Sequence, residues 1–170
     1  MRMCNNIFGD DIVKMKFHLL YLRNLFIHKW YVIIESRKLG ILWRGLTHDL
    51  SKLTLREWLP RARAMEKGTL KNGYGLIDHN HIDDELSLSW LHHYHRNPHH
   101  WQWWVTNLDC GSIKVLPMDD EYRREMLADW LAVSRMPDRM NMIPWYMLNQ
   151  DKMLLHPKTR EWLEEQLGIN

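Results

Sequence analysis

The chain has 170 residues and a mass of 20.8 kDa, which suits one domain that folds without disulfide staples. It carries 23 basic and 21 acidic residues, for a formal net charge of +2. This balance argues against a nucleic-acid coat or a polybasic membrane anchor. Hydrophobic residues at 45% and charged residues at 26% exclude a disordered chain.

The predicted elements are helices. Residues 1–14 are expected to form a loose N-terminal segment. Helical spacing of apolar residues, with turn signals between the segments, predicts helices over 17–39, near 41–50, near 54–66, from 83 or 84 to about 95, from 119 to 135, near 140–150 and over 158–167. Thr54 and Glu57 have the spacing of a capping box at the third of these.

The stretches between these helices, residues 67–77 and 105–117, are expected to be loops or irregular segments because glycine and turn residues gather there. No alternating strand of four or more residues is evident. The predicted fold class is therefore all-α: a single compact bundle of six to eight helices over residues 1–170.

The cysteines and the apolar stretches indicate a cytoplasmic, soluble protein. Cys4 and Cys110 form no disulfide framework and no zinc motif. The longest apolar stretch, 25–34, is interrupted by a histidine and a lysine and is too short to span a membrane. The N-terminal residues also lack the apolar core of a signal peptide.

Two polar residues lie on apolar helix faces. His28 comes three residues after Leu25 and four before Val32, so it shares their face. Asp129 has the same relation to Met126, three residues before it, and to a valine four residues after it. Both side chains are expected to point into the core, where an ionised aspartate needs a partner or a metal.

Histidines gather elsewhere too. His48 and Asp49 are adjacent, and five of the chain's 11 histidines lie within residues 92–100: His92, His93, His95, His99 and His100. Each feature alone is more simply a satisfied core histidine, an ion-paired aspartate or a surface loop. Together they predict a divalent-metal site inside a helical bundle. A nitrogen and oxygen donor set without thiolates suits Fe, Mn, Zn, Co or Ni.

The order of these residues resembles the HD superfamily of metal-dependent phosphohydrolases, an all-helical fold with a His, an adjacent His-Asp and a distant Asp around its metals. More closely, the chain resembles a family of small, largely uncharacterised phage and bacterial proteins. The matching stretches are HKWYV, HDLSK, LHHYHRNPHH, EMLADWLAVSR and LHPKT, which span most of residues 25–160.

This resemblance implies that His28, His48, Asp49 and Asp129 are metal ligands. It also implies one to three ions and further ligands from His92 or His93 and from His99 or His100. The sequence does not choose within either pair, because adjacent helical residues point about 100° apart.

The resemblance further implies hydrolysis of a phosphoester by a metal-activated water, with Asp49 holding that water or accepting its proton. Lys52, and more weakly Arg96, are expected to offset charge on the phosphate, and Trp103 or Trp104 to stack on a base. The implied substrate is a small phosphorylated molecule such as a nucleotide. The chain lacks the Gly-Tyr-Pro segment of the cyclic-dinucleotide phosphodiesterases, so a particular substrate does not carry over.

Two alternatives remain open. An HD-like protein can hold a di-iron pair for oxygenation, and a phage protein can act without catalysis by binding a host factor or sequestering a nucleotide. As partners, we expect a small molecule, no membrane and no nucleic acid, and the apolar aromatics make a homodimer plausible.

Overall fold

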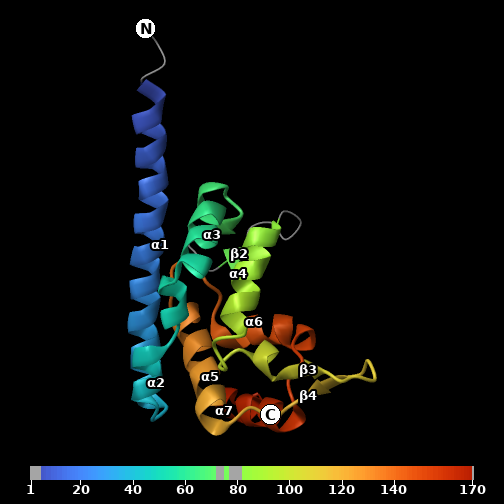
Figure 1. The fold of residues 1–170 in the computed structure, drawn as a ribbon. Coiled ribbons are helices and arrows are strands. Elements are labelled where there is room, and N and C mark those ends of the chain that lie inside the picture. The colour runs from blue at the N-terminus through green and yellow to red at the C-terminus, as the bar shows by residue number, and fades with distance from the viewer. Residues whose placement is uncertain (1–4, 72–74, 77–81, 170) are drawn as a thin grey trace. The chain divides into compact units, whose positions relative to one another are not determined.

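A computed structural model describes residues 5–71, 75–76 and 82–169. Helices dominate this part of the chain (Figure 1), so the predicted mostly helical fold is confirmed. Its α-helices are α1 (Asn5–Lys38), α2 (Leu42–Thr47), α3 (Leu55–Glu66), α4 (Asp84–Tyr94), α5 (Asp120–Ser134), α6 (Met142–Asn149) and α7 (Pro157–Leu167). Three short 3-10 helices join them: η1 (Leu50–Leu53), η3 (Trp101–Trp104) and η4 (Gln150–Lys152).

Two small antiparallel ladders lie in the segments predicted to be irregular. Strand β1 (Leu70–Lys71) pairs with β2 (Gly75–Leu76), and β3 (Val105–Asn107) pairs with β4 (Ile113–Val115). Gly111 has a φ of 82° in the β3–β4 turn, a left-handed backbone that favours glycine. In the described part of the chain all these strands have two or three residues, too few for an alternating pattern to show in the sequence.

The first helix is longer than the sequence indicates. It begins at Asn5 and so includes most of the segment expected to be loose. The histidines His79 and His81, expected on the surface, and Cys4 lie outside the described residues. Within the described ranges, no helix combines the length and the apolar composition that crossing a bilayer requires.

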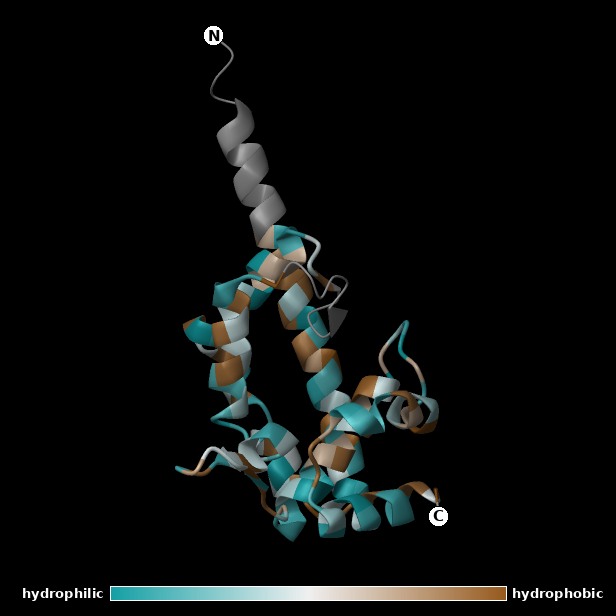
Figure 2. Ribbon diagram, turned by 90° about the vertical axis from the view of Figure 1, so that its right-hand side faces the viewer, coloured by the Kyte–Doolittle hydropathy of each residue, from teal (hydrophilic) through white to brown (hydrophobic). Residues whose placement is uncertain are grey.

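Contacts within the range predicted as one domain gather into two compact units. Unit 1 comprises Met1–Ile27 and Leu50–His93, and unit 2 comprises His28–Asp49 and Tyr94–Asn170. Hydrophobic and hydrophilic residues alternate along the helices of both (Figure 2), as expected for helices that bury one face.

Unit 1 has a small core of Tyr21, Ala64, Met65, Leu70 and Leu86. The α3 and α4 helices run beside each other in this unit (Figure 1), where Arg63 binds Glu85 and Lys67 binds Asp83 at 2.7 Å.

Unit 2 has a core rich in methionine, built on α5, α6 and α7: Met118, Met126, Leu127, Met142, Tyr146, Met153 and Leu163. In the same unit α2 lies very close to α1. A Cβ added at Gly45 would lie 2.6 Å from the Ser36 Cβ and 3.2 Å from the Ile33 Cα. Only glycine allows this approach, which brings α2 against α1 three residues before His48.

Candidate metal centre

Four of the predicted ligands meet in unit 2. His28 comes from α1, His48 caps the C-terminal end of α2, Asp49 follows it, and Asp129 comes from α5. The donor atoms of His28, His48 and Asp49 all lie within 4.8 Å of one another. A second set with the same spacing shares His48 and adds His99 and Asp129.

The helix faces place these side chains as the spacing predicts. His28 is 1% exposed, between Leu25 and the fully buried Val32. Asp129 is 8% exposed and lies one turn beyond the buried Met126. Both side chains therefore point inward among apolar neighbours, where each needs a polar partner.

The distances join the residues into one cluster. His28 Nε2 lies 3.0 Å from Asp129 Oδ1, and His48 Nε2 lies 3.5 Å from the same oxygen. His48 Nε2 is also 3.2 Å from Asp49 Oδ2, while His99 Nε2 is 3.5 Å from Asp49 Oδ1. The Nε2 atoms of three imidazoles thus face oxygens of two carboxylates.

A further carboxylate, Glu125, stands behind two of the histidines. Its Oε1 atom lies 3.0 Å from His48 Nδ1 and 3.2 Å from His99 Nδ1. The sequence analysis missed this residue. The available signal was its position four residues before Asp129, which puts both carboxylates on the same face of α5.

The charges in the cluster stabilise one another. Burial lowers the pKa of His48, but the charge of Asp49 and hydrogen bonds to Asp129, Asp49 and Glu125 together raise it well above its ordinary value. Burial raises the pKa of Asp129, yet hydrogen bonds from His28 and His48 hold it well below its usual range. Burial likewise opposes ionisation of Glu125, and hydrogen bonds from His48 and His99 lower its pKa to about 2.

The backbone at Asp49 is in the left-handed region, with a φ of 56°. Asp138 shares this feature among the non-glycine residues that the structure describes. Such a backbone is disfavoured by roughly 1–2 kcal/mol for an ordinary L-residue and is tolerated best by glycine, asparagine and aspartate. The turn lets His48 and Asp49 face the same cluster, and Lys29 Nζ donates to the His48 carbonyl beside it.

A second histidine–carboxylate group lies in unit 1. Glu57 is fully buried, and its two oxygens bind His92 Nδ1 at 2.9 Å and His93 Nδ1 at 2.8 Å. The expected capping box is therefore wrong. Thr54 makes no side-chain cap, because its hydroxyl donates to the Ser51 carbonyl at 2.7 Å, and the carboxylate of Glu57 is bound to imidazoles.

The remaining predicted residues are in varied surroundings. Lys52 is buried in η1 of unit 1, and Arg96 is exposed in unit 2. Trp103 is 43% exposed. The ring of Trp104 packs against the methionine-rich core, and its indole N–H donates to the Pro98 carbonyl at 2.7 Å.

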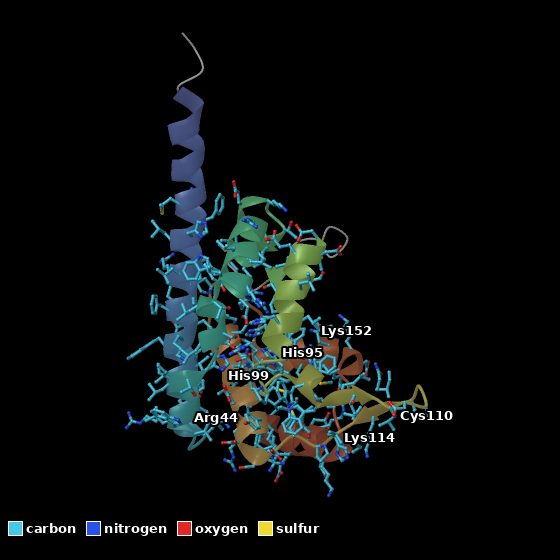
Figure 3. All side chains as sticks on the ribbon, viewed as in Figure 1. Arg44, His95, His99, Cys110, Lys114 and Lys152 are labelled. Carbon is cyan, nitrogen blue, oxygen red and sulfur yellow. The ribbon has the colours of Figure 1, made fainter. Side chains whose placement is uncertain are left out.

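The choice between His99 and His100 is also informed by the structure. His99 is buried and bound to Glu125, and Figure 3 shows its side chain among those of the interior. His100 is partly exposed, and its ring lies edge-on to Tyr94 at 5.2 Å. Its donor atom still lies within 4.8 Å of those of Asp49 and His99.

One family model, described as a family of unknown function (DUF5662), matches residues 18–169. The chain belongs to the DUF5662 family. All the residues of the two histidine–carboxylate groups fall inside the matched range. No curated protein and no solved structure matches the chain.

The cluster in this DUF5662 chain fits a bound cation. His48 donates from Nδ1 to Glu125, since an ionised carboxylate only accepts. Its Nε2 atom then faces oxygens of Asp49 and Asp129 at 3.2 and 3.5 Å. At such distances a proton on Nε2 or a metal ion must lie between the nitrogen and the oxygens, because facing lone pairs repel. The buried His and Asp groups could therefore hold a metal ion.

Proposed function

We propose that this protein is a metal-dependent phosphohydrolase of the HD type. The observation that carries the proposal is the convergence of His28, His48, Asp49 and Asp129 from three separate elements into one buried cluster. These are the same four positions at which the sequence resembles the HD ligand pattern. A buried group of imidazoles and carboxylates without an obvious structural need is a candidate catalytic site.

The donor set supports a transition metal. Its ligand atoms are imidazole nitrogens and carboxylate oxygens, and no thiolate is among them. Such a set suits Fe, Mn, Zn, Co or Ni, with one to three ions. A calcium site would be built from oxygens alone.

When bound, the ion supplies Lewis acidity, which lowers the pKa of a water molecule and offsets charge on phosphate oxygens. The chain's own residues do the rest. Asp49, whose two oxygens face His48 and His99, accepts the proton of the attacking water. Asp129 would be a ligand beside His28 and His48, whose Nε2 atoms lie 3.0 and 3.5 Å from its Oδ1 atom.

The substrate we propose is a nucleotide or another small phosphoester. Trp103 offers an exposed indole on which a base can stack, whereas Trp104 is held in the core. Arg96 is exposed in the same unit and can meet a phosphate.

The test begins with the purified wild-type protein. Metal content is measured by mass spectrometry, and phosphate release is assayed from a panel of nucleotides with Mn, Fe, Co, Ni and Zn. Asp129→Asn should abolish turnover and lower metal content, because it removes an ionised ligand at nearly constant volume. Asp109→Asn, at an exposed aspartate of the β3–β4 hairpin, is the matched control and should leave both unchanged.

The proposal is overturned if the wild-type protein binds none of these metals, or if it binds them and releases no phosphate from any substrate. Iron bound on purification together with an O₂-dependent product would indicate oxygenation as the reaction. A biological effect that survives Asp129→Asn would indicate a non-catalytic role.

A further inference from the structure

The two buried glutamates repeat one arrangement. In unit 2, Glu125 lies 3.0 Å from His48 Nδ1 and 3.2 Å from His99 Nδ1. In unit 1, Glu57 lies 2.9 Å from His92 Nδ1 and 2.8 Å from His93 Nδ1. In all four imidazoles the contact is made by the same ring nitrogen.

This choice of nitrogen has a chemical consequence. An ionised carboxylate only accepts hydrogen bonds, so each Nδ1 atom carries the proton. In a neutral imidazole the lone pair is then on Nε2, which is the atom a metal binds. A carboxylate behind a ligand histidine fixes its tautomer and ring orientation and makes it a stronger donor.

We propose that Glu125 and Glu57 are positioning residues for metal binding, each presenting the Nε2 atoms of two histidines as ligands. The inference rests on the metal-binding part of the proposed function and deepens it. It also bears on the pairs that the sequence left open. For the first pair it predicts that both His92 and His93 carry their proton on Nδ1, toward Glu57. For the second pair, His99 and His100, it favours His99 as the ligand, because His99 is the residue bound to Glu125.

Each glutamate is held by more than one side chain. Glu125 accepts from two imidazoles, those of His48 and His99. Glu57 lies one turn before Arg61, whose guanidinium nitrogen is 3.8 Å from the Glu57 carboxylate. Arg61 is fully buried and its guanidinium lies 4.0 Å above the ring of Trp90, so removing the Glu57 charge would take a counter-charge away from a buried cation.

The experiment measures the zinc affinity of single variants by competition with a chelator. Glu125→Gln and Glu57→Gln keep the side-chain size and remove the charge, and each should weaken zinc binding about 10- to 100-fold. Glu165→Gln and Glu66→Gln are the controls, because both are exposed helical glutamates, in α7 of unit 2 and α3 of unit 1. The controls should bind zinc as the wild type does.

Two further measurements separate positioning from simple loss of structure. Far-UV circular dichroism checks each variant, and Glu57→Gln/Arg61→Met is measured as well, because Glu57→Gln alone leaves the buried Arg61 charge unbalanced. In zinc-loaded wild-type protein, long-range ¹H–¹⁵N spectra should show a proton on Nδ1 and zinc on Nε2 for the ligand histidines. This second measurement needs no variant.

A wild-type protein that binds zinc through Nδ1 of His48 or His99 overturns the positioning role, and so does unchanged affinity in well-folded Glu125→Gln. In both cases zinc is bound, so the metal site itself survives. A wild-type protein that binds no zinc, manganese, iron, cobalt or nickel overturns the metal site and the positioning role together.

Discussion

The close approach of α2 to α1 gives a sharp test of how His48 is placed. Gly45→Ala would put a Cβ atom 2.6 Å from the Ser36 Cβ, 2.8 Å from its Oγ and 3.2 Å from the Ile33 Cα. The first two distances are shorter than ordinary contacts, and the third involves backbone that cannot rotate away. The α2 helix must therefore shift, and His48, three residues later, shifts with it.

The expected magnitude combines two opposing terms. Overpacking of a buried site destabilises a protein by typically about 1–3 kcal/mol. Replacing a helical glycine with alanine recovers about 0.5–1 kcal/mol. The net loss of stability lies between about 0 and 2.5 kcal/mol, which corresponds to a fall in Tm of up to roughly 10 °C for a chain of this size. Zinc affinity should fall with it, because a ligand moves.

The assay is thermal unfolding of a double-mutant cycle with Ser36→Gly. That second change removes both short contacts and leaves the 3.2 Å approach to Ile33. It destabilises α1 by about 0.5–1 kcal/mol on its own, as glycine does inside a helix. In the double variant the two losses should not add, because the clash has been removed. A Gly45→Ala protein more stable than the wild type, or losses that add fully, would refute the packing argument.

Three other predictions follow from the candidate metal centre and the proposed substrate. Removing metal with a chelator should lower Tm. Adding zinc at about 100 times its Kd should then raise the free energy of unfolding by about 2.7 kcal/mol, measured by calorimetry. Equal Tm values with and without zinc would contradict this. Without metal, stability should be lost as pH falls below about 4, because folding lowers the pKa values of Glu125 and Asp129. Stability should also be lost as pH rises above about 6.5, because folding raises the pKa of His48 and the folded protein gives up that proton at higher pH. Glu125→Gln should flatten the acid side of that curve, and an unchanged curve would count against the assignment. Finally, Trp103→Ala should raise KM for nucleotides and leave metal content intact, whereas Trp43→Ala, at an exposed tryptophan of α2, should leave KM as it is.

Helical spacing correctly predicted that His28 and Asp129 point inward. His28 and Asp129 repeat the helical period of buried neighbours, and a period of this kind depends only on local geometry. The mostly helical class followed from the same periodicity. The meeting of the two residues with His48 and Asp49 depends on long-range packing. The sequence indicated it only through the combination of chemically similar residues and the HD resemblance.

The glutamates were harder to find, because their sequence context favours common surface roles. Glu57 stands three residues after a threonine at a helix start, and this pattern predicts a cap. Burial and contact with His92 and His93 decide otherwise, and neither is local in the sequence. The strands of two and three residues were missed for a related reason, since their pairing is set by the turns between them.

The left-handed backbone at Asp49 limits how this position can be varied. With a φ of 56°, alanine or glutamate there would add backbone strain to the loss or shift of the carboxylate, so two effects would be mixed. Asparagine tolerates the same backbone and keeps the shape of the side chain. Among simple replacements, Asp49→Asn therefore comes closest to changing the charge alone.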